Sequence, residues 1–198
     1  MTRSPWALQT IKSRSLGSHL IHFWQNEEEF ERGVRFLELG ITTNPSIASC
    51  SDTTKRINGF WRFYGRNIRS LLQEARLVIL RREVSASETL ANIEAAFAAA
   101  VSKGATAIRY LGNLGMGEAP LPGKGADEVV ELENGATLLG RRYPCVIVCM
   151  YDVNTVSGRL VLNAGFGTHP LAVRGHALRQ NAYFAPHEEA ARTHGAAL

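Results

Sequence analysis

The fold is decided by the stretch YPCVIVCMYD, residues 143–152. Pro144 opens a strongly apolar run that ends in the acid Asp152. A short apolar run bounded by turn residues is typical of a strand that is buried in a parallel sheet. We therefore expect a strand at residues 145–151. Asp152 then lies at the carboxyl edge of the sheet, where α/β proteins place their ligands.

On both sides of this strand, segments with strand patterns alternate with segments of helical spacing, which is typical of an α/β domain with a mostly parallel sheet flanked by helices. The further expected strands are residues 19–24, 45–50, 77–80 and 105–111. The expected helices are a segment that Asn26 caps, a segment within residues 53–76, and residues 87–103, 127–142 and 156–166. Residues 170–173 and 177–178 predict a C-terminal β-hairpin with its turn at Gly175 and His176.

Length and composition indicate one globular domain. The chain has 198 residues, of which 45% are hydrophobic and 20% are charged, and its formal net charge is +4. We expect a flexible N-terminal arm at residues 1–18, a single domain at 19–186 and a tail at 187–198. The three cysteines form no Cys-x-x-Cys motif, and we expect no disulfide framework. The sequence shows no leader pattern and no apolar run long enough for a membrane span, so we expect a cytoplasmic protein.

The common catalytic and metal-binding motifs do not occur. Gly123-Lys124-Gly125 lacks both the glycine spacing and the hydroxyl residue of a Walker loop. His169 and His176 have no recognisable ligand spacing. Cys145 and Cys149 share one face of the expected strand, where buried cysteines act as small hydrophobic residues. We therefore predict a protein that is not an enzyme, with no catalytic residue, no metal and no cofactor.

A basic face is expected on the helix within residues 53–76. Arg62, Arg66 and Arg69 are spaced four and three residues apart, beside Trp61 and Tyr64. This pattern fits either an ordinary solvated face or a docking surface for an anionic partner. Direct reading of DNA is not expected, because no helix-turn-helix or zinc-finger pattern occurs.

Several segments together resemble the MEDS domain, the methanogen/methylotroph sensory domain that was first recognised in a dichloromethane-responsive regulator. The opening 17–24, GSHLIHFW, and the segment 112–116, GNLGM, are similar to the family's first strand and to its Gly-Glu-Met segment. The more specific part is the closing signature, which comprises Tyr143-Pro144, Cys149 to Asp152, Thr168 to Leu171 and Arg179 to Phe184. The resemblance runs from residue 17 to residue 186. Residues 53–82 match the family poorly.

The resemblance implies a RecA-like fold with a degenerate phosphate loop and a sensory role. It implies a small, hydrocarbon-like ligand and an output in transcription or kinase signalling. Family members usually adjoin a DNA-binding or kinase domain. We expect no such domain in this chain, and we therefore expect it to signal to a separate output protein. Asn113 stands where the family often has an acid, which weakens the case for a catalytic carboxylate there.

We place the expected ligand site at the carboxyl edges of the strands. Trp24, Met116 and Tyr151 would form apolar walls, and Asn113, Asp152 and His169 would orient the ligand. The alternative hypothesis is an adaptor scaffold on a degenerate nucleotide-binding fold, which docks an acidic partner or nucleic acid through Arg62, Arg66 and Arg69. The alanine-rich segment 95–100 fits either packing within the domain or contact with a second copy of the chain, which would form a homo-oligomer.

Overall fold

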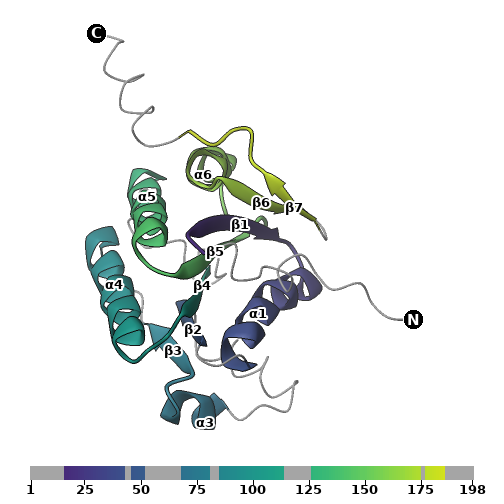
Figure 1. The fold of residues 1–198 in the computed structure, drawn as a ribbon. Helices are drawn as coiled ribbons and strands as arrows, with labels where there is room; N and C mark the ends of the chain where they lie inside the picture. Colours follow the sequence, from purple (N-terminus) through teal and green to yellow (C-terminus); the bar gives the residue numbers. More distant parts are fainter. Residues whose placement is uncertain are drawn as a thin grey trace.

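The computed structural model describes residues 16–42, 46–51, 68–80, 85–113, 126–174 and 177–185. These residues form a seven-stranded sheet with helices on both faces (Figure 1). The strands are β1 (Ser18–Trp24), β2 (Ser46–Ser51), β3 (Leu77–Leu80), β4 (Ala107–Asn113), β5 (Cys145–Asp152), β6 (Leu171–Arg174) and β7 (Ala177–Gln180). Their order in the sheet is β3-β2-β4-β5-β1-β6-β7.

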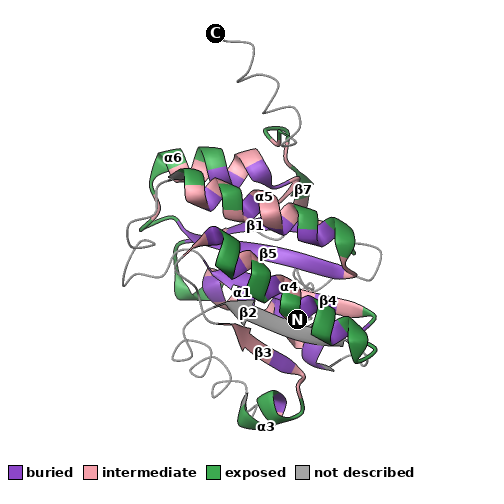
Figure 2. Cartoon of the chain, turned by 90° about the vertical axis from the view of Figure 1, so that its left-hand side faces the viewer, coloured by how far each residue is buried: buried purple, intermediate pink, exposed green. Residues whose placement is uncertain are grey.

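The centre of the sheet is buried on both faces. Every residue of β5 is buried, as its apolar sequence predicts. β1 pairs in parallel with β5 on one side and with β6 on the other. Figure 2 shows both central strands as buried bands beneath helices whose outer sides are exposed. Among the strand pairs of the described residues, only β6 with β7 is antiparallel.

The helices are α1 (Glu27–Thr42), α3 (Ile68–Gln73), α4 (Ala86–Ser102), α5 (Ala126–Arg142) and α6 (Gly158–Leu160), and α6 continues directly into the π-helix η3 (Val161–Phe166). Local sequence explains where two of them begin. The side chain of Asn26 accepts the Glu29 amide, which caps α1. Ser85 and Glu88 form a capping box at the start of α4.

Alternation along the central strands divides the core into two clusters. On one face, Leu20, Trp24 and Met150 pack with residues of α1. On the opposite face, Ile21 and Tyr151 pack with residues of α4 and α5. Buried polar side chains, among them His19 and Glu133, lie on this second face.

The predicted α/β class, the mostly parallel sheet and the C-terminal hairpin are confirmed. The helix predicted at 156–166 is instead a short α-helix followed by a π-helix. Of the helix predicted within residues 53–76, the structure describes only the part that contains α3. The RecA-like assignment and the degenerate phosphate loop stay predictions, and residues 123–125 lie outside the described residues.

Most of the expected N-terminal arm and all of the expected tail also lie outside the described residues, at 1–15 and 186–198. Within the described part of the chain, no helix is both long and apolar enough to cross a membrane.

Candidate functional site

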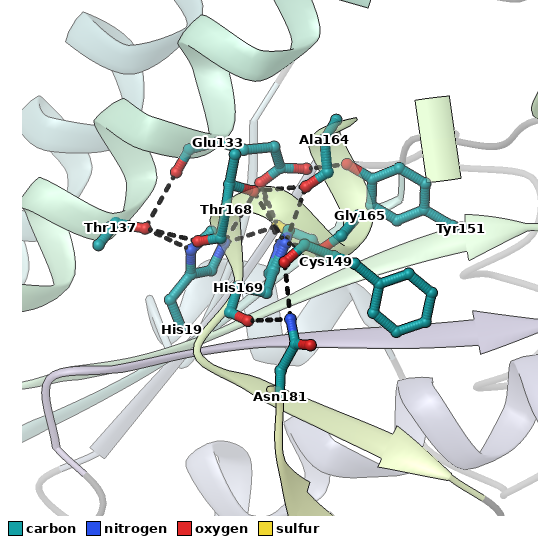
Figure 3. A network of polar contacts seen from close by, with 11 residues as sticks. His19, Glu133, Thr137, Cys149, Tyr151, Ala164, Gly165, Thr168, His169 and Asn181 are labelled. Carbon is teal, nitrogen blue, oxygen red and sulfur yellow. Dashed lines mark hydrogen bonds and ion pairs between the residues drawn. The ribbon is translucent and has the colours of Figure 1, made fainter. Parts of the chain in front are cut away.

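Five polar side chains meet in the interior between α5 and the sheet (Figure 3). We call these residues the buried cluster: His19, Glu133, Cys149, Tyr151 and His169. Each is at most 4% exposed. They come from β1, α5, β5 and the segment between η3 and β6, so helix packing and strand pairing bring together positions that are far apart in the sequence.

The carboxylate of Glu133 lies at the centre of the buried cluster. Its Oε1 atom accepts a hydrogen bond of 2.6 Å from the Tyr151 hydroxyl. Its Oε2 atom accepts a hydrogen bond of 3.1 Å from the Cys149 thiol. The same Oε2 lies 3.2 Å from Nε2 of His19 and 3.4 Å from Nε2 of His169.

The outer nitrogens of both imidazoles are fixed by oxygen atoms. Nδ1 of His19 lies 2.8 Å from the Thr137 hydroxyl, which itself donates to the backbone carbonyls of Glu133 and Thr168. When the hydroxyl donates to one of these carbonyls, it accepts from Nδ1 of His19. Nδ1 of His169 lies 2.8 Å from the carbonyl oxygen of Gly165 and must donate to it. Nδ1 of His169 therefore carries hydrogen, and the Nε2 atoms of both rings face Glu133.

Burial and the neighbouring groups shift the acidities of the buried cluster. Burial, reinforced by the nearby His169 ring, lowers the pKa of His19 to about 4. Burial alone would raise the pKa of Glu133, but His169 and His19 together hold that pKa well below its usual value. Burial and the Glu133 carboxylate raise the pKa values of Cys149 and Tyr151. At neutral pH the site therefore combines a carboxylate with a neutral His19, a thiol and a phenol.

A cavity of about 620 Å³ opens beside the buried cluster, at the carboxyl end of β1 and along the C-terminal hairpin. This volume is typical of sites for small organic ligands. Aromatic and aliphatic side chains share the lining with polar ones. The lining residues are Phe23, Trp24, Gln25, Glu29, Val153, Phe166, Ala172, Val173, Arg179, Gln180, Asn181, Ala182 and Tyr183.

Two contacts join the cavity wall to the buried cluster. The Phe23 ring meets the Tyr151 ring edge-on, with 5.9 Å between their centroids. The Asn181 side chain donates hydrogen bonds of 2.7 Å to the carbonyl oxygens of His169 and Phe166. A molecule in the cavity would therefore press on groups that hold the buried cluster in place.

The structure separates the residues that we expected to form one ligand site. Trp24 lines the cavity, whereas Tyr151 and His169 belong to the buried cluster. Asp152 points to the opposite face of the sheet from Tyr151, since neighbours along a strand alternate. Its carboxylate accepts the backbone amide and the side-chain amide of Asn154.

Of the other expected site residues, Asn113 is buried at the end of β4, and Met116 lies outside the described residues. Arg69 is exposed on α3, while Arg62 and Arg66 lie outside the described part of the chain. The docking surface through these three arginines stays a prediction.

Sequence reasoning did not identify Glu133, His19 and Cys149 as a group. A signal for Glu133 was present, because it follows Val129 by four residues and precedes Ala136 by three, which places it on the apolar face of the helix. For His19, the signal was a polar residue two positions before Ile21 on a buried strand. Phe166 in the cavity wall had no comparable signal, whereas Asn181 lies within the closing signature from Arg179 to Phe184.

The profile of the MEDS family, described as the methanogen/methylotroph, DcmR sensory domain, matches residues 18–170. This chain belongs to the MEDS family. The match confirms the resemblance that the sequence motifs indicate, and it spans all five residues of the buried cluster. The hairpin side of the cavity lies beyond the matched residues. A comparison with curated proteins finds no match.

Proposed function

We propose that this MEDS domain binds a small organic molecule in the cavity beside β1 and the hairpin, and that it regulates a separate output protein in response. The family is a sensory one, which is consistent with this role. The observation that carries the proposal is the cavity of about 620 Å³, in which Trp24 and the other aromatic residues form walls. No catalytic step or cofactor is part of the proposal.

The cavity suits a ligand with an apolar body and a polar end. Phe23, Phe166 and Tyr183 offer aromatic surface, while Glu29 and Arg179 offer charges of opposite sign. A water molecule occupies about 30 Å³ of liquid, so the cavity corresponds to about 20 water molecules. This size favours a ligand larger than a one-carbon compound.

Binding would be communicated through the hairpin. β7 is the last strand of the sheet, and Asn181 directly follows it while holding the His169 and Phe166 carbonyls. A ligand that orders this segment would change an exposed edge that a partner protein can contact. Control of transcription or of a kinase, in the cytoplasm, is the output that we propose for this edge.

Thermal unfolding with a panel of small alcohols, carboxylates, halogenated compounds and hydrocarbons tests the proposal. A ligand that binds only the folded chain raises the melting temperature by mass action. In the variant Ala182→Trp, the added ring fills the cavity, so the shift should disappear. Ala98→Trp, on the exposed side of α4, is the matched control and should keep it. An equal shift in both variants would place the ligand elsewhere.

A further inference from the structure

We propose that the buried cluster is a binding site for a divalent transition-metal ion of the zinc type. The ligands would be Nε2 of His19, Nε2 of His169, Oε2 of Glu133 and Sγ of Cys149. This inference goes beyond the proposed function, because it concerns the interior rather than the cavity. Sequence spacing predicts no metal, since the four donors lie on separate elements of the fold.

The donor atoms already have the spacing of a tetrahedral site. Ordinary zinc bond lengths place pairs of N and O ligands about 3.3 Å apart and pairs that include sulfur about 3.6 Å apart. The two Nε2 atoms lie 3.2 and 3.4 Å from Oε2 of Glu133. Sγ of Cys149 lies 3.1 Å from this oxygen and 3.3 Å from Nε2 of His19. All four donor atoms fall within 4.8 Å of one another.

Three atoms that can bind a cation converge at the centre of the buried cluster. Nδ1 of His169 donates outward to the Gly165 carbonyl, so the neutral form of that ring has its lone pair at Nε2, and the same holds for His19 when its Nδ1 donates to Thr137. The two Nε2 atoms and Oε2 of Glu133 converge (Figure 3), and the Cys149 thiol donates to this oxygen. Nε2 of His169 is buried and makes no hydrogen bond to any described residue. A cation at this point would satisfy all three acceptors.

Three of the four ligands have the outer partner that metal sites use to orient their ligands. Thr137 holds the His19 ring, and the Gly165 carbonyl holds the His169 ring. The Tyr151 hydroxyl occupies Oε1 of Glu133 at 2.6 Å, which leaves Oε2 to bind the ion. The π-helix contributes here, because it presents the carbonyls of Ala164 and Gly165 to one ring nitrogen.

The charges also balance. When the ion binds, the S–H bond of Cys149 breaks, a metal–sulfur bond forms and the proton leaves to solvent. The carboxylate and the thiolate then carry two negative charges, which match a divalent cation in a fully buried site. Two imidazoles, a thiolate and a carboxylate are donors that suit zinc better than magnesium or calcium. Four protein ligands leave no open position, as in structural zinc sites.

Cobalt is the probe for this site, because tetrahedral Co²⁺ has visible ligand-field bands and a near-ultraviolet charge-transfer band from a thiolate. The full chain is expressed in minimal medium with Co²⁺ or Zn²⁺, desalted, and measured by elemental analysis and absorption. We expect one metal ion per chain and, with cobalt, both sets of bands. Glu133→Gln should lower the affinity at least tenfold, by the scale on which even orienting residues act.

The matched variants are Cys149→Ser and Cys145→Ser. Both cysteines are buried on β5, but Sγ of Cys145 is directed to the Leu139 carbonyl, 4.0 Å away, and is not part of the buried cluster. Only Cys149→Ser should lose the charge-transfer band. A wild-type chain that carries only background metal would overturn the proposal. A thiolate charge-transfer band that both variants keep would also overturn it. Neither result depends on a ligand in the cavity, so this proposal and the proposed function can fail separately.

Discussion

Nε2 of His169 lies 3.4 Å from Oε2 of Glu133, although the two residues are 36 positions apart and belong to different layers of the fold. This contact joins the middle of α5 to the segment that leads into the hairpin. The same residue, His169, gives its backbone carbonyl to Asn181 in the cavity wall. The buried cluster therefore lies between the helix layer and the proposed ligand cavity, in contact with both.

Glu133→Ala should strongly destabilise the chain. The substitution leaves the Tyr151 hydroxyl, the Cys149 thiol and two imidazoles without their common partner, in a site that water does not reach. Breaking a buried charged network in this way costs about 3–5 kcal/mol. Urea unfolding followed by circular dichroism measures the free energy of unfolding.

The matched control for this variant is Glu28→Ala. The Glu28 carboxylate is 72% exposed and pairs with Arg32 one helical turn away. Pairs of this kind contribute about 0.3–0.5 kcal/mol. A similar loss of stability in both glutamate variants would contradict the claim that Glu133 stabilises the fold through the buried cluster.

Tyr151→Phe should weaken the buried cluster while leaving its metal ligands in place. The change removes the hydroxyl that donates to Oε1 of Glu133, a hydrogen bond to a charged group worth about 1.5–3 kcal/mol. The cobalt bands should remain, with an affinity about 10–100-fold lower. Tyr143→Phe, whose hydroxyl reaches the exposed carboxylate of Glu94 at 3.3 Å, is the control and should change neither property.

The stability of the metal-free chain should fall in mild acid. Burial lowers the pKa of His19 to about 4 and also lowers the pKa of His22. In the unfolded chain both histidines take up protons near pH 6.5, whereas in the folded chain they stay neutral to lower pH. The unfolded state then binds more protons, so the free energy of unfolding decreases as the pH drops from about 6.5 towards 4. The slope is at most about 1.4 kcal/mol per pH unit for each histidine.

Urea unfolding at pH 7.5 and pH 5.5 measures this dependence. In the variant His22→Gln, the free energy of unfolding should change less steeply with pH than in the wild type. The variant has one histidine fewer that binds a proton on unfolding. Equal or higher stability of the wild type at pH 5.5 would show that the histidines are not held neutral.

Asp152→Ala should reduce stability without changing ligand affinity. Asp152 accepts two hydrogen bonds from Asn154 at the turn after β5 and does not line the cavity. Loss of such contacts costs about 1 kcal/mol each. Asp152→Asn keeps an acceptor and should recover most of the stability. A clear loss of affinity for a cavity ligand in Asp152→Ala would return this residue to the ligand site where the sequence analysis placed it.

Much of the fold was predictable because local chemistry determines it. The apolar run of β5 is buried along its full length, and Asn26 marks the start of α1 through its side-chain acceptor, as predicted. The Ser85 cap was not predicted, and the expected helix began at residue 87. The site was less predictable. Tyr151 and Asp152 were expected in one pocket, although alternation along a strand directs adjacent side chains to opposite faces.

The partners of Tyr151 and His169 depend on which elements pack together, and spacing along the chain does not contain this information. Glu133 becomes the neighbour of His19 only because α5 covers the β1–β5 pair. The bend that turns the His169 ring inward depends on a π-helix, for which the sequence analysis had no criterion. These contacts are tertiary, and they carry the candidate site.

The most direct test of the account is an amide NMR spectrum of the ¹⁵N-labelled chain, titrated with a compound that raises its melting temperature. We predict shifts at Val153, Asn181 and Tyr183 in the cavity, together with shifts at Gly165 and His169 beside the buried cluster. Asn181→Ala should keep the shifts at Val153 and Tyr183 and lose those at Gly165 and His169, because it removes the hydrogen bonds that connect the two groups. Shifts confined to α3 and α4, away from the cavity, would contradict the proposed ligand site.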